Sequence, residues 1–271
     1  SCINSLILSK RKQIKLLNEF RESSISYYIT HGIHKNAMRK THIYWLDQVP
    51  AEWKETKLKH ILKKERRELP LNAELLICSN SGEVKKRGES KIGLVAESND
   101  VYQGVLAGDL LIHGMDTWHG AIAISEFDGM CTPVVHVCTT SQDKRFICYY
   151  LKMMAYKKVF KAISNGVRQN TSDFRSWDKV GDLLIAFPNI NEQNQIADYL
   201  DNLVANINSL ITNYQEQIEK LHDLKNIVIF NVVTGKINIQ DIEIPAFDIV
   251  DEDIDEEKIT SNDDIEDAEV E

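Results

Sequence analysis

The stretch INSLITNYQEQIEKLHDLKNIVIFNVVTGKI, from Ile207 to Ile237, resembles a stretch near the start of the chain. The earlier copy, INSLILSKRKQIKLLNEFRESSISYYITHGI, runs from Ile3 to Ile33, and a shift of 204 residues aligns the two without a gap. Both copies open with INSLI, and identical residues recur along their length. The whole middle of the chain separates them, so we look for one structural role that both ends of the sequence share.

Each copy carries a heptad pattern of apolar residues. From Ile196 onward the apolar residues recur in alternating steps of four and three, with one miss at Lys225. This pattern is typical of a helix that pairs with another helix. The first copy keeps the same register and breaks it at the polar residues Lys10, Arg21 and Ser24. An isolated helix cannot bury such a stripe, so we expect the copies to pair, the alternative being that each packs separately on the middle of the chain. The predicted interface consists of Ile3, Ile7, Ile14, Leu17, Ile207, Ile211, Ile218 and Leu221.

Both helices have recognisable ends in the sequence. Pro188 precedes the second helix, and Asn189 or Asn191 is suited to cap its start. Glycine tolerates the left-handed backbone conformation that ends many helices. Gly235 and Gly32 are therefore predicted to end the second and the first helix.

The net charge of −9 is unevenly distributed. Residues 248–271 contain thirteen acidic residues and one lysine, which leaves 28 acidic and 31 basic residues, a charge of +3, in the rest of the chain. We expect the acidic tail to be disordered, the alternative being that it shields a basic surface of the same molecule. The five cysteines form no CxxC pair and indicate a reducing, cytoplasmic location. No apolar run reaches the roughly 18 residues of a membrane span, so no membrane association is expected.

The middle of the chain, about residues 34–187, predicts an α+β globular domain. Alternating apolar residues in GDLLIHG, GAIAIS and PVVHVCTT are typical of strands, and glycines recur between such segments. One helix is predicted from Arg145 to Ile163. A basic run between Lys54 and Arg67 is interpreted as a solvated helix face.

The usual signatures of catalysis are absent from the sequence. It contains no P-loop, no GxSxG, no HExxH, no complete dinucleotide-binding fingerprint and no adjacent prolines of an amino-methyltransferase motif. Cys131, His136 and Cys138 lack the second ligand pair that a zinc site needs, and buried cysteines are the simpler interpretation. Glu89 and Lys91 could be half of a nuclease motif, but a charged turn is favoured because no Pro-Asp precedes them.

Three loops combine basic, amide and aromatic side chains. Arginine can bind guanine through two hydrogen bonds, asparagine and glutamine can do the same with adenine, and lysine suits phosphates. Polar loops also serve solubility alone, so DNA binding is a hypothesis for each loop. The candidate DNA-binding residues are Ser79, Asn80, Lys85, Lys86 and Arg87 in the first loop, His113, Asp116 and Trp118 in the second, and Arg168, Gln169 and Asn170 in the third.

The order of these segments resembles the specificity (S) subunit of type I restriction–modification systems. The resemblance covers about residues 3–239 and rests on IYWLDQVPAEWKETKLK, GDLLIHGMDTWHGAIAISEFDGMCTPVVHV, GVRQN, FPNINEQNQIADYLDNLVANINSLI and VVTGKI. In such subunits, target recognition domains alternate with conserved helical regions that pair as an antiparallel coiled coil. The resemblance therefore implies helical regions at 1–34 and 188–239, a recognition domain at 35–187 and a tail at 240–271.

The function implied by the resemblance is DNA binding without catalysis. The recognition domain would read one half of a bipartite site in double-stranded DNA, and the paired helices would set the spacing between two such domains. Methyltransferase subunits carrying S-adenosylmethionine would methylate adenine, and an endonuclease/translocase subunit would cleave, so this chain would bind no cofactor itself. A complete subunit has two recognition domains and this sequence has one, so it is similar to a half-subunit or a C-terminal half, and a homodimer would restore two. The alternative is a coiled-coil protein scaffold that does not bind DNA.

Overall fold

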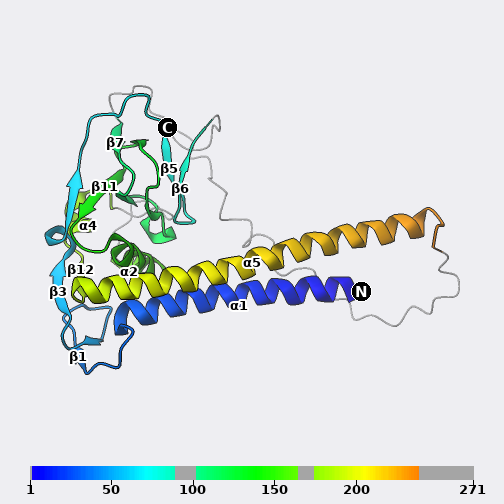
Figure 1. Ribbon diagram of the computed structural model, residues 1–271, viewed down its shortest axis with the longest axis horizontal. Helices are drawn as coiled ribbons and strands as arrows, with labels where there is room; N and C mark the ends of the chain where they lie inside the picture. The colour runs from blue at the N-terminus through cyan, green and yellow to red at the C-terminus, as the bar shows by residue number, and fades with distance from the viewer. Residues whose placement is uncertain (1, 89–101, 164–173, 238–271) are drawn as a thin grey trace. The chain divides into compact units, whose positions relative to one another are not determined.

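The computed structural model describes residues 2–88, 102–163 and 174–237. The described chain packs as two units, which are treated separately. The coil unit contains residues up to Ser24 together with those from Leu200 onward, and the globular unit contains the described residues between Ile25 and Tyr199. Two long helices contribute to both units: α1 spans Cys2–His31 and α5 spans Ile190–Val233 (Figure 1).

In the coil unit α1 and α5 lie side by side and run antiparallel (Figure 1). The Lys10 ammonium lies over the ring of Tyr214, 4.5 Å from its centroid. Further along α1, Arg21 Nη1 donates to Asn208 Oδ1 at 2.7 Å. Because the residue number rises along α1 while that of its partner falls along α5, the two helices have opposite directions.

The face shared by the two helices follows the repeated heptad register. Ile7 and Ile207 are buried, with 6% and 3% of their surface exposed, and the other six residues predicted for the interface are half-buried. The polar breaks of the first copy lie on the same face: Lys10 and Arg21 make the contacts above, and Ser24 is buried. Two of the three breaks, Lys10 and Arg21, are therefore polar contacts across the pair. The α+β class with two long antiparallel helices is confirmed.

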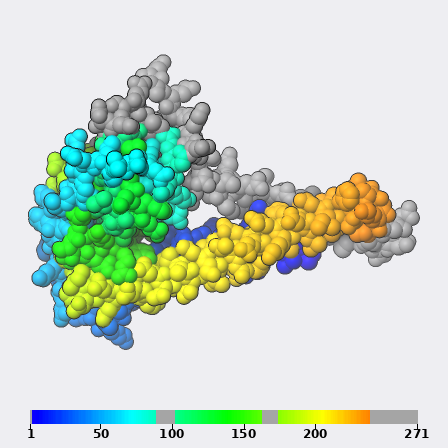
Figure 2. Space-filling view, turned by 45° about the horizontal axis from the view of Figure 1, so that its top comes forward, coloured from blue at the N-terminus to red at the C-terminus, as the bar shows by residue number. Residues whose placement is uncertain are grey.

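The C-terminal end of α5 extends past the N-terminal end of α1 (Figures 1 and 2). Half-buried positions recur on the heptad face as far as Lys225, and the next five residues are exposed. Within residues 2–88, 102–163 and 174–237 no helix pairs with this end, and this unpaired end carries large apolar side chains that are about half exposed or more, at Ile227, Ile229, Phe230 and Val233. Apolar groups in water are unfavourable, so a partner that covers this end of the helix would be stabilising.

Glycines end the two long helices, and an asparagine caps the start of α5. Gly32, with φ +73°, donates its N–H to Tyr28 O at 3.0 Å directly after α1, and Gly235 follows α5 with φ +71°. L-residues rarely adopt such φ values, whereas glycine does so freely. At the start of α5, Asn189 Oδ1 accepts the N–H of Glu192 at 3.1 Å, so Asn189 rather than Asn191 is the cap.

The globular unit is built on an antiparallel sheet with the strand order β4-β11-β8-β9. Its central strands, β8 and β11, coincide with two of the alternating segments of the sequence, and β9 coincides with the third. Nearly all side chains of β8 and β11 are buried, as expected for strands covered on both sides. The strands are β4 (Leu62–Glu65), β8 (Leu110–His113), β9 (Ile122–Ile124) and β11 (Val135–Thr140).

Four two-stranded ladders and several short helices complete the globular unit. An apolar core including Leu76, Val105, Leu111 and Val137 connects the main sheet to two of these ladders. The remaining elements are β1 (Met38–Lys40), β2 (Gln48–Pro50), β3 (Lys54–Lys57), η1 (Leu58–His60), β5 (Leu76–Cys78), β6 (Val84–Lys86), β7 (Gln103–Val105), η3 (Thr117–His119), β10 (Gly129–Cys131), α2 (Lys144–Tyr156), α3 (Val159–Ile163), α4 (Trp177–Gly181) and β12 (Leu184–Phe187). The paired strands are β1 with β2, β3 with β12, β5 with β6 and β7 with β10.

The start of α5 is tied into the globular unit by a buried glutamine. Gln193 is fully buried, and its amide nitrogen donates to Pro188 O and Gln142 Oε1, each at 2.8 Å. Its amide oxygen accepts the N–H of Asp143 at 3.1 Å. Nearby, Trp53 Nε1 donates to Glu192 Oε1 at 3.4 Å. A buried amide with its hydrogen bonds satisfied fixes orientation, so these contacts set the direction in which α5 begins.

Two local predictions are wrong. The helix predicted from Arg145 to Ile163 is two helices, α2 and α3, because the chain turns at Lys158, whose φ is +57°. The basic run from Lys54 to Arg67 is mostly strand, in β3 and β4 with η1 between them. Lysines of this run are themselves ladder positions, Lys54 and Lys57 opposite β12 and Lys63 and Lys64 opposite β11, a context that charge spacing does not reveal.

The stability of the paired helices should depend far more on the buried Ile207 than on an exposed neighbour of similar size. We expect Ile207→Ala to lower the free energy of unfolding by about 2–4 kcal/mol, since it removes a buried side chain and leaves a cavity. Leu210, 48% exposed on the same helix, is the matched control, and Leu210→Ala should stay within about 0.5 kcal/mol. Urea denaturation followed by helical circular dichroism measures both, and equal losses would contradict the pairing.

Candidate nucleic-acid interface

The first predicted loop is the turn of the β5–β6 hairpin, residues 79–83. The turn is closed by its own backbone, because Ser79 N–H donates to Glu83 O and Gly82 N–H donates to Ser79 O, both at 2.9 Å. Gly82 has φ +74°. Asn80 at the tip is exposed, so its amide is available to an external partner.

The second predicted loop, residues 113–120, contains η3. The Lys161 ammonium lies over the indole of Trp118, 4.8 Å from the ring centroid, and the ring of His119 packs against the same indole. The indole Nε1 is buried and has no hydrogen-bond partner among the residues that the structure describes. Gly120 ends the loop with φ +91°. Trp118 is thus held between neighbouring side chains and supports the loop from within.

The third predicted loop, with Arg168, Gln169 and Asn170, lies outside the described residues. The chain after it is firmly attached to the second loop. Phe174 N–H donates to Gly114 O at 3.0 Å, and Phe174 O accepts the N–H of His136 Nε2 at 2.7 Å. A Cβ at Gly114 would lie 2.8 Å from Phe174 O and 2.9 Å from Val134 O. Only glycine leaves room for this close approach of three backbone segments.

The first and second loops lie next to each other in the structure. A Cβ at Gly82 would lie 3.2 Å from Gly120 O, and a Cβ at Gly120 would lie 3.8 Å from Asn80 O. The second loop therefore contacts the hairpin turn through Gly120 and the Phe174 segment through Gly114. Residues from the first two candidate sets, some 30 positions apart in sequence, are thereby brought to one region of the globular unit.

His113 and Asp116 are partners of each other. Asp116 N–H donates to His113 Nδ1 at 3.2 Å, and an Asp116 carboxylate oxygen lies 3.0 Å from the same nitrogen. Burial lowers the pKa of His113, which outweighs the opposite effect of the Asp116 charge. His113 is therefore a neutral hydrogen-bonding group near neutral pH and supplies no positive charge for phosphates.

The lysines of the hairpin already have acidic partners. Lys85 Nζ lies 3.2 Å from Glu83 Oε2, and Lys86 Nζ lies 2.6 Å from Glu74 Oε2. All four side chains are largely exposed, so these ion pairs are weak and exchange readily with another anion. Arg87 at the end of β6 is half-buried. The hairpin can therefore offer two cations to a phosphate backbone.

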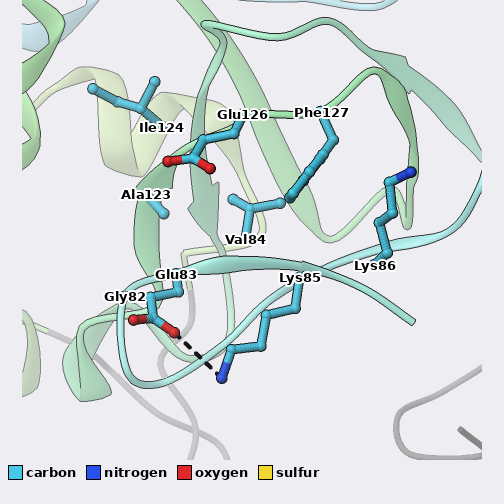
Figure 3. A pocket seen from close by; sticks show the side chains of 9 residues that line it. All are labelled: Gly82, Glu83, Val84, Lys85, Lys86, Ala123, Ile124, Glu126 and Phe127. Carbon is cyan, nitrogen blue, oxygen red and sulfur yellow. Dashed lines mark ion pairs between the residues drawn. The ribbon is translucent and has the colours of Figure 1, made fainter. Parts of the chain in front are cut away.

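A shallow groove of about 510 Å³ runs beside the hairpin (Figure 3). Val84, Ala123 and Phe127 form its apolar part. Positively charged lysines and negatively charged glutamates line the rest of it. Lys86 Nζ lies 5.3 Å from the centroid of the Phe127 ring. The mixed charge around the groove favours no particular class of small ligand.

No metal or reactive-thiol chemistry is indicated among the described residues. No group of three or more histidine, cysteine or carboxylate side chains there could hold a metal ion. Burial raises the pKa of the Cys131 thiol to about 12 and also raises the pKa of the Cys138 thiol, which keeps both protonated. In the part of the chain that the structure describes, no helix is long and apolar enough to cross a membrane. Glu89 and Lys91 lie outside the described residues.

Three residues that support the loops were not found from the sequence. Lys152 contacts the hairpin turn, Lys161 contacts Trp118, and His136 holds Phe174. Lys152 and Lys161 look like polar positions of helices, and His136 was considered only as a metal ligand. No sequence signal identifies them, because their partners are backbone atoms or rings more than 30 residues away.

Comparison with known proteins gives a family and a fold. A family model described as the type I restriction modification DNA specificity domain matches residues 50–220. No curated protein matches the chain. A solved chain from work on complex assembly and conformational transition of the type I R-M system aligns with TM-score 0.53 and 13% identity, over 84% of this chain and 56% of that chain. At this identity the likeness concerns the fold alone.

Two further solved structures align less closely. The HsdS subunit from Thermoanaerobacter tengcongensis gives a TM-score of 0.48 and 13% identity, over 87% of this chain and 57% of that one. The type-I restriction-modification system S subunit from M. genitalium gives a TM-score of 0.43 and 13% identity, over 84% of this chain and 56% of that one. The chain thus spans little more than half the length of the solved chains that it resembles.

The buried histidine behind the loops should make stability depend on pH. Burial lowers the pKa of His136 below its ordinary value of 6.5. His136 therefore binds a proton more readily in the unfolded chain than in the folded protein. Its neutral form contributes fully to the free energy of unfolding above about pH 6.5, and this contribution is lost as the pH falls from there towards the lowered pKa. We expect the melting temperature of His136→Gln, which keeps an N–H donor, to fall less than that of the wild type between about pH 7.5 and about pH 5.5.

The exposed His222 on α5 supplies the control for this experiment. His222→Gln should leave the pH dependence of the melting temperature unchanged. Parallel curves for the wild type and His136→Gln would show that His136 does not contribute.

Proposed function

Because the chain belongs to the type I restriction modification DNA specificity family, we propose that it recognises one half of a bipartite target in double-stranded DNA as a specificity subunit. Membership of this family confirms the resemblance read from the sequence. The observation that carries the proposal is the contact between the hairpin turn and the second loop, at Gly82 and Gly120. This contact gathers candidate base-reading and phosphate-binding residues in one region.

The chemistry of this region suits a reader of DNA. Asn80 offers an exposed amide that can bind adenine through two hydrogen bonds in the major groove. Lys85 and Lys86 on the same hairpin can bind phosphates, which position a protein without specifying sequence. Both lie on an antiparallel ladder whose inner side chains, Leu76 and Cys78, are buried. A rigid frame that carries exposed polar tips is what base recognition requires.

The proposal assigns catalysis to partner subunits. Methyltransferase subunits with bound S-adenosylmethionine would methylate adenine, and an endonuclease/translocase subunit would cleave. This chain would bind no cofactor and would contribute recognition and assembly. Because DNA binding of this kind depends on phosphate contacts, its affinity should decrease steeply as the salt concentration rises.

The outer face of α1 supports a role in assembly. Leu6, Leu16 and Phe20 are 46%, 54% and 55% exposed, and their spacing of ten and four residues fits a second heptad face. Paired helices with an additional apolar face can accept a further amphipathic helix. We place the methyltransferase subunits on this face, where a partner helix would cover the three side chains.

The unpaired end of α5 supports a homodimer. Ile229 and Val233 correspond through the repeat to Ile25 and Ile29 of α1. The residues of α1 are 2% and 0% exposed, whereas those of α5 are 50% and 80% exposed. Equivalent positions are therefore buried in one copy of the repeat and open in the other. A further amphipathic helix would supply the missing cover, and we propose a second molecule of this chain as its source, which would also supply the second recognition domain.

A coiled-coil scaffold that does not bind DNA is the second candidate, and the exposed face of α1 favours it. A gel shift at increasing salt concentration distinguishes the two functions. Affinity that decreases steeply with salt supports the DNA reader, whereas absence of DNA binding together with capture of methyltransferase subunits supports the scaffold.

Asn80 and Lys85 should behave differently when they are replaced by alanine. Asn80→Ala should weaken binding to the target duplex by about 1–3 kcal/mol and leave unrelated DNA unaffected, since it removes a base contact. Lys85→Ala should weaken binding to all sequences alike and reduce the salt slope by about 1, since it removes a phosphate contact. The target is obtained from the methylation pattern of the host, and fluorescence anisotropy measures each affinity. An equal, small loss for both variants on every sequence would remove Asn80 from the base-reading residues.

Phe20 should matter for assembly and not for DNA affinity. We expect Phe20→Glu to weaken the complex with methyltransferase subunits by at least tenfold, roughly 1.4 kcal/mol, because it places a charge under the partner helix. Glu19→Ala, at the exposed residue before it, is the matched control. Analytical ultracentrifugation measures the complex, and normal assembly of Phe20→Glu would place the partner elsewhere.

A further inference from the structure

We propose that Lys152 is a positioning residue that fixes the hairpin turn 79–83 against the loop 113–120 and thereby contributes to sequence specificity without touching DNA. The proposal rests on the DNA-recognition function above. The proposal is based on one hydrogen bond, in which Lys152 Nζ on α2 donates to Gly82 O at 3.0 Å. The bond joins a helix to the tip of a hairpin 70 residues earlier in the chain.

Lys152 is carried by a rigid element. Its neighbours Leu151 and Met153 are both fully buried. The helix begins at Asp143, whose carboxylate accepts the N–H groups of Arg145 and Phe146, an arrangement that stabilises its first turn. The position of the Lys152 ammonium is therefore set by the core of the globular unit.

The hairpin turn is shaped so that Lys152 fits against it. A Cβ on Gly82 would lie 2.7 Å from both Cε and Nζ of Lys152, so the lysine occupies the space that only glycine leaves free. The same Cβ would lie 3.2 Å from Gly120 O. One glycine thus contacts α2 and the second loop together, and a change in the turn is transmitted to both.

The hydrogen bonds within the turn do not fix where the turn lies. The bonds from Ser79 to Glu83 and from Gly82 to Ser79 close the turn on itself. They determine its shape and join the turn to nothing outside the hairpin. The bond from Lys152 comes from outside the hairpin, and a charged donor makes it stronger than a neutral one. Lys152 therefore determines the direction in which Asn80 presents its amide.

The chain offers a matched control on the same helix. Lys144 of α2 also donates from Nζ to a glycine carbonyl, Gly108 O. Gly108 belongs to a different turn, which contains none of the candidate DNA-binding residues. Loss of either lysine removes one charge and one hydrogen bond to a backbone carbonyl, so only the turn that is affected differs.

The test compares Lys152→Met, Lys152→Arg and Lys144→Met in the full chain. Affinities are measured for the target duplex and for a scrambled duplex over a range of salt concentrations, together with melting temperatures. We expect Lys152→Met to lower the affinity for the target duplex about tenfold and to leave the affinity for the scrambled duplex unchanged. The dependence of affinity on salt concentration should also stay unchanged. Lys152→Arg, which keeps a donor, should recover part of the loss, and Lys144→Met should bind both duplexes like the wild type.

Three results would overturn the proposal. An equal loss on both duplexes with a salt slope smaller by about 1 would make Lys152 a phosphate contact. Equal losses for Lys152→Met and Lys144→Met, together with lower melting temperatures, would make its role one of general stability. Target affinity equal to that of the wild type would leave Lys152 without a role in specificity.

A second measurement does not depend on DNA and separates this proposal from the function itself. If the wild type prefers no duplex, the proposed function fails, and amide hydrogen exchange still tests the contact. Lys152→Met should speed exchange of the Gly82 and Glu83 amides and leave α2 unchanged, whereas Lys144→Met should leave the hairpin unchanged. Unaltered exchange at Gly82 in Lys152→Met would show that the lysine does not hold the turn.

Discussion

The fold depends on the mutual burial of two heptad faces that share one sequence. Neither long helix could keep its apolar stripe from water alone, and in the coil unit each supplies the cover that the other needs. An antiparallel pair of similar helices has an approximate two-fold axis, so equivalent residues in the first part of the repeat, where the two helices pair, meet similar surroundings. Positions 7, 14 and 17 of the first copy and 211, 218 and 221 of the second are all shielded. The repeat at a distance of 204 residues is thereby explained by symmetry.

The polar residues on this face give the pairing its register. Apolar heptads alone allow helices to slide by one heptad at little cost, whereas a specific polar contact between the helices is satisfied in one alignment only. Lys10 over Tyr214 and Arg21 with Asn208 are such contacts. These residues interrupt the apolar pattern in the sequence, and in the structure they define which turn of α1 meets which turn of α5.

The globular unit separates a closely packed frame from exposed tips. At Gly114 the backbone segments approach so closely that any side chain would collide, and at Gly82 and Gly120 the positive φ values would strain any other residue. Contacts between backbone atoms and from Lys152 and His136 hold these segments, and the exposed residues between them are free to change. Under the proposed function, such a frame would let recognition change by substitution at the tips while the loops keep their places.

The sequence by itself determined the long helices, their shared heptad face, the strands β8, β9 and β11, and the composition of the candidate loops, because periodicity and glycine placement are local properties. It could not show that α2 ends before Lys158, that the basic run after Lys54 forms strands, or that Glu83 and Glu74 pair with the hairpin lysines. Only the tertiary structure decided which loops meet and that Lys152, His136 and Lys161 support them. Such contacts join residues far apart in the chain through backbone atoms and rings, and no local pattern encodes them.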